Sequence, residues 1–439
     1  MFKETSKELL DFLSKSPTAF HAVENYRQIL NADGFKELLE SEHWDIVPGG
    51  KYYVTRNNTS ILAFKVGTKL DNYSFNIVTS HTDSPTFKVK ENAEIEVKNK
   101  YTQLNTEGYG GMLCATWLDR PLSIAGRVLV SEGNSIVTKL LNIDRDLLMI
   151  PNVAIHMNRA ANDGFKYNLQ VDMLPLLSAG DDRQKDFKQI IADELGVKKE
   201  DILGHDLYLY NRMAPSIWGA NEEFISAGHL DDLQCGFASL KALLAGYNDE
   251  SIDIMACFDN EEVGSGTKQG ADSTLLRDTL TRINSALGKT EEDYHRALAS
   301  SFMLSSDNAH AVHPNHPEHT DATNCTYMNE GVVVKSHAGQ KYTSDGVSMA
   351  VVKALASGAD VPLQYFANRS DKAGGSTLGN IAMAQASMNA VDIGLPQLAM
   401  HSSYETAGIK DTYYAISLMK ALFDSHIQET STHSLEIKR

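Results

Sequence analysis

Residues 252–266 read IDIMACFDNEEVGSG. The first part, Ile252–Phe258, is a nearly continuous apolar run of the kind that forms a buried strand in a parallel sheet. Three carboxylates in four residues, Asp259, Glu261 and Glu262, follow at its end. Carboxylates that lose water at the end of a buried strand need a cation or hydrogen-bond donors to compensate them. The stretch therefore favours a metal site at the end of a central strand, and a solvated acidic turn before a helix is the alternative.

Four further segments place Asp or His next to an apolar run. They contain His81 and Asp83, then His229, Asp231 and Asp232, then Asp307 and His310, and finally His401. Each has an ordinary explanation when taken alone, such as a hydrogen-bonded loop histidine, a helix cap or a solvated loop. Because sites in α/β proteins are assembled where the carboxyl ends of strands meet, five such segments in one chain favour a shared polar site. An imidazole with a carboxylate two residues away, as in His81 and Asp83, is a pairing that zinc sites use.

Composition limits the classes of protein that need to be considered. The chain has 439 residues, of which 42% are hydrophobic and 22% are charged, so a sizeable core is expected and wholesale disorder is excluded. The length fits two to three domains of about 150 residues, or one large domain with an insertion. The formal net charge of −17 argues against nucleic acid and membranes as partners, because anionic partners need a basic face. The excess of acidic residues has two possible explanations: it keeps the protein soluble, or it includes carboxylates that bind cations.

The cellular location is predicted from signals that the sequence lacks. The N-terminal stretch MFKETSKELLDFLSKS has acidic residues among its apolar positions, unlike the uninterrupted apolar core of a signal peptide. No segment approaches the roughly 20 apolar residues of a membrane span. The four cysteines lie far apart without a C-x-x-C pair and are expected to be reduced. We therefore expect a cytoplasmic protein.

The character of the sequence changes near residues 89 and 222. Between these positions, alternating runs such as Ser123–Val130 predict strands with one exposed face, and the polar stretch from Asp181 to Asp201 predicts a surface helix. On either side of this region, predicted strands and helices alternate, as in an α/β protein. We therefore expect an α/β domain made of residues 1–88 and 223–439, interrupted by a β-rich assembly module at residues 89–222.

Three common catalytic motifs are missing from the sequence. Gly264–Lys268 looks like a phosphate-binding loop, but the spacing G-x-x-x-x-G-K-[ST] is absent. Gly374–Leu378 departs from G-x-S-x-G at its last position, so a nucleophilic serine on a strand-to-helix turn is not supported. The absence of H-E-x-x-H excludes the mononuclear zinc proteases that carry that motif.

The motifs HTDSP, HLDDL, DNEEVGS, SSDNAHAVHPN and MHSSYE occur in this order along the chain. In this ordered set the chain closely resembles the aspartyl aminopeptidase family of dinuclear zinc exopeptidases. The resemblance runs from SPTAFH at residues 16–21 to the helix expected over Thr412–Phe423. It implies a zinc-exopeptidase catalytic domain with a central mixed sheet flanked by helices, and an inserted β-rich dimerisation domain. It also implies a homo-oligomer, namely a tetrahedral dodecamer built from dimers.

The resemblance also implies roles for individual residues. Two Zn²⁺ ions per chain would be held by five ligands, and Mn²⁺ or Co²⁺ would suit the same nitrogen and oxygen donors. Glu261 would be the general base that acts on a water bridging the metals, and Asp83 would orient a histidine ligand. The metal ligands would be His81 and Asp307 for one ion, His401 and Glu262 for the other, and Asp231 for both. The substrate contacts would be His310 and Lys335, together with His156, which would reach a neighbouring subunit's site.

The resemblance predicts a metallo-aminopeptidase that removes N-terminal Asp or Glu from peptides with a free N-terminus. An aminopeptidase of neutral or broad specificity is one alternative, and a non-catalytic peptide-binding scaffold is another. The presence of both Glu261 and Glu262 argues against the scaffold. The choice of Asp231 over Asp232 as the bridging ligand rests on alignment through Leu230 and Leu233.

Overall fold

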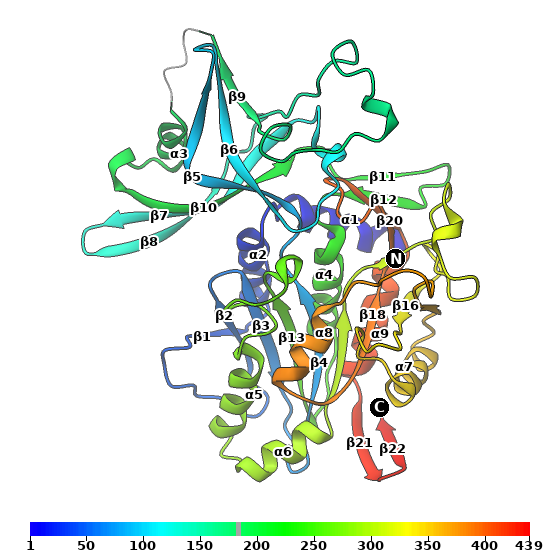
Figure 1. The fold of residues 1–439 in the computed structure, drawn as a ribbon. Coiled ribbons are helices and arrows are strands. Elements are labelled where there is room, and N and C mark those ends of the chain that lie inside the picture. The colour runs from blue at the N-terminus through cyan, green and yellow to red at the C-terminus, as the bar shows by residue number, and fades with distance from the viewer. Residues whose placement is uncertain (181–185) are drawn as a thin grey trace.

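The computed structural model describes residues 1–180 and 186–439. Figure 1 shows a larger α/β body, drawn below, and a smaller β-rich part above it. The body is formed by segments from both ends of the sequence, and the β-rich part is formed by the chain between them. The predicted α/β class, with a mixed sheet flanked by helices and a β-rich insertion, is confirmed.

A nine-stranded mixed sheet forms the centre of the body. Four neighbouring strands in its middle, β13, β4, β14 and β18, run parallel to one another. Their carboxyl ends therefore lie along one edge of the sheet. In spatial order the strands are β1 (Lys36–Leu38), β2 (Lys51–Arg56), β3 (Ser60–Val66), β13 (Ser251–Phe258), β4 (Ser74–His81), β14 (Phe302–Ser306), β18 (Asn389–Gly394), β16 (Val332–Lys335) and β17 (Leu363–Phe366).

Helices cover both faces of this sheet. Those that pack in one hydrophobic cluster are α1 (Phe2–Ser14), α2 (Ala19–Ala32), α4 (Leu230–Ala245), α7 (Gly346–Gly358) and α9 (Asp411–Phe423). Those that pack in the cluster on the other face are α5 (Leu275–Ala286), α6 (Glu291–Ala299) and α8 (Leu378–Gln385).

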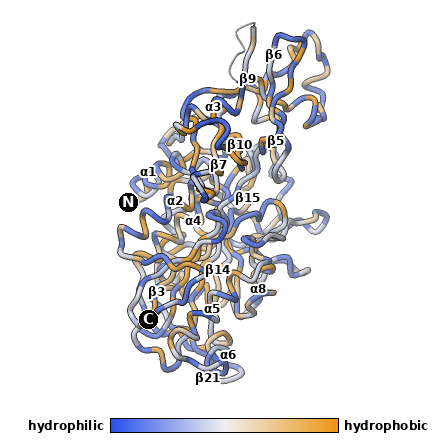
Figure 2. Tube along the Cα trace, turned by 90° about the vertical axis from the view of Figure 1, so that its left-hand side faces the viewer, coloured by the Kyte–Doolittle hydropathy of each residue, from blue (hydrophilic) through white to orange (hydrophobic). Residues whose placement is uncertain are grey.

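Strand β13 is buried along its whole length because its side chains enter both clusters. Met255 and Cys257 belong to the cluster under α4, whereas Ile254 and Phe258 belong to the cluster under α5. This is the alternation that the period of two in a strand requires. Figure 2 shows hydrophobic and hydrophilic segments alternating along the chain, as expected when an element buries one face.

The β-rich part is an antiparallel sheet with its own hydrophobic cluster, which includes Phe87 and Trp117. Residues 187–195 form the helix α3 within the predicted helical stretch, of which residues 181–185 lie outside the described residues. In spatial order its strands are β8 (Ser135–Asn142), β7 (Leu122–Glu132), β10 (Ile202–Asn211), β5 (Thr86–Val97), β6 (Tyr101–Tyr109) and β9 (Leu176–Ala179).

A five-stranded sheet lies where the two parts meet in Figure 1. Its strands are β11 (Ser216–Trp218), β12 (Phe224–Ala227), β20 (Glu405–Gly408), β19 (Pro396–Leu398) and β15 (Ala309–His310). A hairpin of β21 (His426–Ser431) and β22 (Ser434–Lys438) completes the chain. Among the described residues, none of the helices has the length and apolar character needed to cross a membrane.

The apolar run of β13 contains one carboxyl group, Asp253, which is 2% exposed. Its Oδ1 accepts hydrogen bonds from Ser251 Oγ at 2.9 Å and from Asn76 Nδ2 at 3.1 Å. Burial raises the pKa of Asp253 to about 8. The native protein therefore keeps a proton that the unfolded chain releases near its ordinary pKa of about 4.

We expect the free energy of unfolding to fall as the pH rises from about 4 to about 8, because the unfolded chain binds fewer protons in this range. Asp253→Asn should remove this contribution, which is on the order of a few kcal/mol over the whole range. Urea unfolding at several pH values measures the difference between the two proteins. The exposed Asp71→Asn variant is the control, and identical pH slopes for wild type and Asp253→Asn would contradict the prediction.

Candidate metal centre

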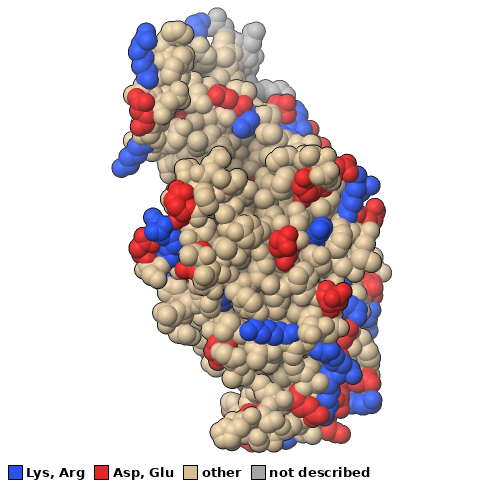
Figure 3. All heavy atoms as spheres, turned by 90° about the vertical axis from the view of Figure 1, so that its right-hand side faces the viewer, with Lys and Arg blue, Asp and Glu red and all other residues tan. Residues whose placement is uncertain are grey.

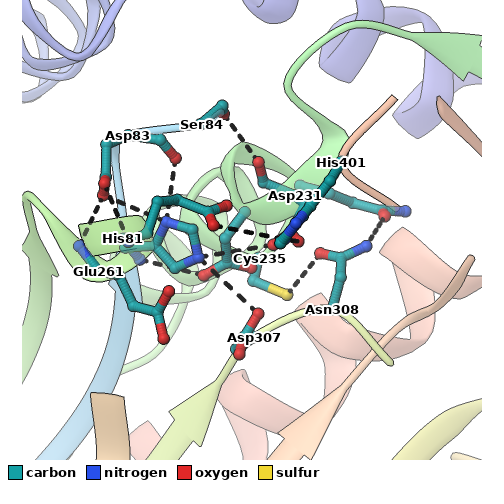
Figure 4. A network of polar contacts seen from close by, with 12 residues as sticks. His81, Asp83, Ser84, Asp231, Cys235, Glu261, Asp307, Asn308 and His401 are labelled. Carbon is teal, nitrogen blue, oxygen red and sulfur yellow. Dashed lines mark hydrogen bonds and ion pairs between the residues drawn. The ribbon is translucent and has the colours of Figure 1, made fainter. Parts of the chain in front are cut away.

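Three adjacent strands of the central sheet end at one cluster of polar side chains. His81 is the last residue of β4, and Asp307 follows β14 directly. Glu261 and Glu262 follow β13 in a short 3₁₀ turn. Because these strands are parallel neighbours, they deliver their side chains to the same place, as Figure 4 shows for His81, Glu261 and Asp307.

Asp231 and His401 reach the cluster from the five-stranded sheet instead. Strand β12 leads through His229, which has a φ of 62°, into Asp231 at the start of α4. His401 follows β19 and has a φ of 65°. The five sequence segments therefore do meet at one site, but they come from two sheets rather than from one.

Asp231 lies between the two histidines. Its Oδ1 is 3.5 Å from His81 Nε2, and its Oδ2 is 3.5 Å from His401 Nε2. Asp307 Oδ1 lies 3.8 Å from His81 Nε2, and Glu262 Oε2 lies 3.3 Å from His401 Nε2. Atoms bound tetrahedrally to one zinc ion at 2.0–2.2 Å are about 3.3–3.6 Å apart. Three of the four distances fall in this range, and the distance of 3.8 Å between Asp307 and His81 is slightly longer, so the spacing suits ligands that share an ion.

Both histidines are oriented through their second ring nitrogen. His81 Nδ1 lies 3.0 Å from the carbonyl oxygen of Asp83 and 3.4 Å from its carboxylate. His401 Nδ1 lies 2.9 Å from the carbonyl oxygen of Gly111, a residue of the β-rich part. A ring that donates from Nδ1 to such an oxygen leaves Nε2 free to bind a metal. In both cases Nε2 is the atom that faces Asp231.

The Asp83 carboxylate mainly holds the turn that carries the two glutamates. Its Oδ1 accepts a hydrogen bond from the backbone N–H of Glu261 at 3.1 Å, and its Oδ2 accepts one from Glu262 at 3.2 Å. Tyr109, at the end of β6, donates its hydroxyl to Oδ2 at 2.7 Å. Asp83 therefore contacts His81 through its main-chain oxygen as well as its carboxylate, and the carboxylate also holds the neighbouring loop. That Asp83 orients a metal ligand stays a prediction.

The cluster carries more buried negative charge than its hydrogen bonds compensate. Asp231 Oδ1 and Glu262 Oε1 are buried and accept no hydrogen bond from any residue that the structure describes. Burial raises the pKa of Glu262 well above its usual value, and the charge of Asp231 adds to this effect. Burial also raises the pKa of Glu261 to about 7. These oxygens are buried acceptors that a cation would satisfy.

At two positions, contacts inside the cluster shift the pKa in the direction opposite to the effect of burial. Burial alone would raise the pKa of Asp231, but contacts with His401 and His81 hold it well below its usual range. Burial alone would lower the pKa of His81, but its carboxylate neighbours Asp231, Asp307 and Asp83 raise it well above its usual value. Protons and metal ions therefore compete for the same atoms. Two imidazoles with several carboxylates form a donor set that zinc accepts, so the residues fit the metal.

Asp232, the alternative bridging residue, faces a different way. Its Oδ2 accepts a hydrogen bond from the backbone N–H of His81 at 3.0 Å. It can join His81 and Asp307 in one group of ligand atoms, but it is not within 4.0 Å of His401. Asp231 is the carboxylate that contacts both histidines.

The predicted substrate contacts are placed in three different surroundings. Lys335 is 3% exposed, donates to the carbonyl oxygen of Asn308 at 2.8 Å and lies 3.6 Å from Asp307 Oδ2. His310 is exposed and is the last residue of the short strand β15, three positions after Asp307. His156 does not join the cluster of its own chain; it is exposed in the loop between β8 and β9.

Glu405 is a positioning residue that the sequence analysis missed. Its Oε2 accepts a hydrogen bond from the backbone N–H of Asp231 at 3.0 Å, and its Oε1 accepts one from His401 at 2.8 Å. The side chain is 2% exposed. One carboxylate therefore ties together two segments that carry predicted ligands. The signals in the sequence were the motif MHSSYE, which ends with Glu405, and the position of this acid at the start of the short strand β20.

We expect Glu405→Gln to weaken metal binding, because its amide nitrogen would face one of the two backbone N–H groups. Loss of such an outer contact costs about 10- to 100-fold in metal affinity. Competition between the protein and a zinc chelator measures this affinity. The exposed Glu429→Gln variant is the control. Equal zinc affinities for wild type and Glu405→Gln would show that the Glu405 carboxylate does not position the ligands.

The chain is similar to known proteins over nearly its whole length. Residues 12–423 match the family described as aminopeptidase I zinc metalloprotease (M18). A probable M18 family aminopeptidase 2 of Clostridium novyi (strain NT) is 48% identical over 425 residues, covering 95% of this chain and 98% of that protein. One from Stutzerimonas stutzeri (strain A1501) is 39% identical, covering 97% of this chain and 99% of that protein.

Two solved structures show the same architecture over nearly the whole chain. The cryo-EM structure of the Ape4 and Nbr1 complex has a TM-score of 0.93 at 35% identity and covers 96% of this chain and 86% of that one. The structure of the S. cerevisiae mApe1 dodecamer has a TM-score of 0.84 at 28% identity and covers 96% of this chain and 97% of that one.

Proposed function

Because the chain belongs to the M18 family of zinc aminopeptidases, we propose that it uses two zinc ions to release N-terminal Asp or Glu from peptides. The observation that carries the proposal is the Asp231 carboxylate, whose two oxygens each face the Nε2 atom of a different histidine. One shared carboxylate between two imidazoles is suited to two adjacent ions rather than to one.

Five residues would hold the two ions. His81 and Asp307 would bind one, His401 and Glu262 would bind the other, and Asp231 would bind both. Two Zn²⁺ ions carry +4 and the three carboxylates carry −3, so the set nearly neutralises itself, as buried charges must. Mn²⁺ or Co²⁺ would suit the same donors.

When bound, the two ions would lower the pKa of the attacking water and polarise the scissile carbonyl. Glu261 would take the proton from that water and return it to the leaving amine. Burial raises the pKa of Glu261, and a raised pKa helps a carboxylate to take a proton and to return it. The hydrogen bond from its backbone N–H to Asp83 holds the turn, so its carboxylate is directed by a fixed main chain.

The acidic preference would come from hydrogen-bond donors and cations beside the cluster. A cavity of about 240 Å³ is lined by His310, Asn368, Arg369, Lys372 and Met400, among others. Asn368 Nδ2 is buried there and has no hydrogen-bond partner among the described residues. Lys335 Nζ lies 3.6 Å from Asp307 Oδ2, and Asp307 precedes His310 by three positions. This surrounding favours a carboxylate, and Lys335 and His310 are its proposed contacts.

The β-rich part would serve assembly. Its loop over residues 149–171 exposes large apolar side chains, including Val153 at 54%, Met157 at 86% and Val171 at 70%. Several exposed apolar side chains on one loop suit a protein interface. We place the dimer contact here, with His156 reaching the neighbouring subunit's site and the dimers assembling into a dodecamer, as the name of the mApe1 structure states for that protein.

Two further features support a cytoplasmic enzyme that acts on peptides. The four cysteines are free thiols, as in a reducing compartment. On the face drawn in Figure 3, acidic and basic side chains are interspersed and no broad basic patch is seen. Nucleic acid and anionic membranes need such a patch.

Glu261→Gln tests the proposed chemistry. We expect zinc binding to persist while kcat falls about 10²- to 10⁴-fold, because the base is lost but the ligands stay. Hydrolysis of Asp- and Glu-initiated peptides with free and acetylated N-termini, measured beside zinc content, gives both quantities. Glu262→Gln is the matched variant and should lose metal. Cleavage of acetylated peptides, or full activity of Glu261→Gln, would refute the assignment.

Lys335→Ala tests the proposed specificity. Peptides that begin with Asp or Asn have nearly the same shape and differ in charge, so their KM ratio isolates the recognition of the carboxylate. Losing one charge-assisted hydrogen bond of about 1.5–3 kcal/mol should raise the KM for the Asp peptide roughly tenfold or more, relative to the Asn peptide.

The exposed Lys353→Ala variant should leave the KM ratio of wild type unchanged. Because Lys335 also lies near Asp307, a fall in kcat for both peptides is expected in Lys335→Ala. Equal changes in KM for the two peptides would favour the aminopeptidase of broad specificity. No cleavage of any peptide by wild type would favour the non-catalytic scaffold.

A further inference from the structure

Three histidines without an assigned role lie on one loop next to the cavity described above, which His313 and His319 also line. His313, His316 and His319 recur at every third position, separated by Pro314 and Pro317. The last part of the loop, Pro317–His319, is a 3₁₀ turn. In such a turn, side chains three residues apart lie above one another. The loop therefore brings the imidazoles to one side, although its prolines prevent a regular α-helix.

The ring geometry shows this grouping directly. The rings of His316 and His319 are stacked, with centroids 5.5 Å apart and an interplanar angle of 25°. The ring of His313 lies 5.3 Å from that of His316. Glu318 Oε1 lies 3.1 Å from His316 Nδ1. One ligand atom each from His316, Glu318 and His319 can be chosen so that all lie within 4.8 Å of one another.

The positive charge of Arg369, which lies next to this loop, is compensated by Asp371. Arg369 donates a hydrogen bond to the carbonyl oxygen of Glu318. Its guanidinium also forms two contacts of 2.9 Å with the two carboxylate oxygens of Asp371. The Glu318 carboxylate is 58% exposed and points to His316 rather than to Arg369. Its negative charge is thus available to a cation that the two imidazoles bind.

We propose that His316, Glu318 and His319 form a third, exposed binding site for a divalent transition-metal ion, with zinc as the expected occupant. Two imidazole nitrogens and one carboxylate oxygen are a donor set that suits zinc, nickel or copper, whereas calcium and magnesium prefer oxygen alone. The site belongs to a different segment from the ligands proposed above. It does not depend on the proposed peptidase activity.

Zinc counted per chain in the full-length protein tests this site. After equilibrium dialysis against a series of zinc concentrations, wild type should bind one ion per chain more than His316→Ala and one more than His319→Ala. His295→Ala is the matched control, because His295 is an exposed histidine that lies near a single glutamate, at 3.8 Å. It should bind as many ions as wild type.

Because each substituted side chain is exposed, circular dichroism should show the same folded protein in all variants. Counting the difference in bound ions separates this site from the catalytic one, since the ions at the latter are present in every variant. Equal zinc content in wild type and His316→Ala would overturn the proposal. It would also be overturned if only one of the two variants lost the ion, or if the difference arose only above about 1 mM zinc.

Discussion

The arrangement of the whole molecule depends on the cost of burying carboxylates without a compensating charge. Asp231 and Asp307 both lie within 3.8 Å of His81, and Asp231 and Glu262 both lie within 3.5 Å of His401. Two of the oxygens of these carboxylates have no hydrogen-bond donor in the part of the chain that the structure describes. Several buried charges of one sign are too costly to keep together unless cations join them. The fold brings the acids together, and a metal centre explains why they can stay there.

Main-chain hydrogen bonds to two buried carboxylates fix the geometry of that centre. Glu405 holds the backbone of Asp231 and His401, and Asp83 holds the backbone of Glu261 and Glu262. The β-rich part contributes two further contacts. The carbonyl oxygen of Gly111 faces His401 Nδ1, and the Tyr109 hydroxyl donates a hydrogen bond to Asp83. The insertion therefore supports the site within one chain, in addition to its proposed role in assembly.

Local patterns in the sequence predicted those parts of the structure that depend on neighbouring residues. The apolar run of β13 and the acids behind it, and the histidine at the end of β4, follow from alternation and strand ends. The five-stranded sheet could not be predicted, because its strands come from residues 216–227, 309–310 and 396–408 and pair only in the folded chain. Gly111 contacts His401 across 290 positions and Glu405 contacts Asp231 across 174, so no local pattern could indicate these two contacts. The contact of Glu405 with His401 spans only four positions.

The most direct test of the two-ion centre is anomalous diffraction at the zinc absorption edge from crystals of the zinc-loaded protein. We expect two peaks flanking the Asp231 carboxylate, one beside His81 and one beside His401. A single peak between the histidines, or none, would contradict the shared carboxylate on which the proposed chemistry rests.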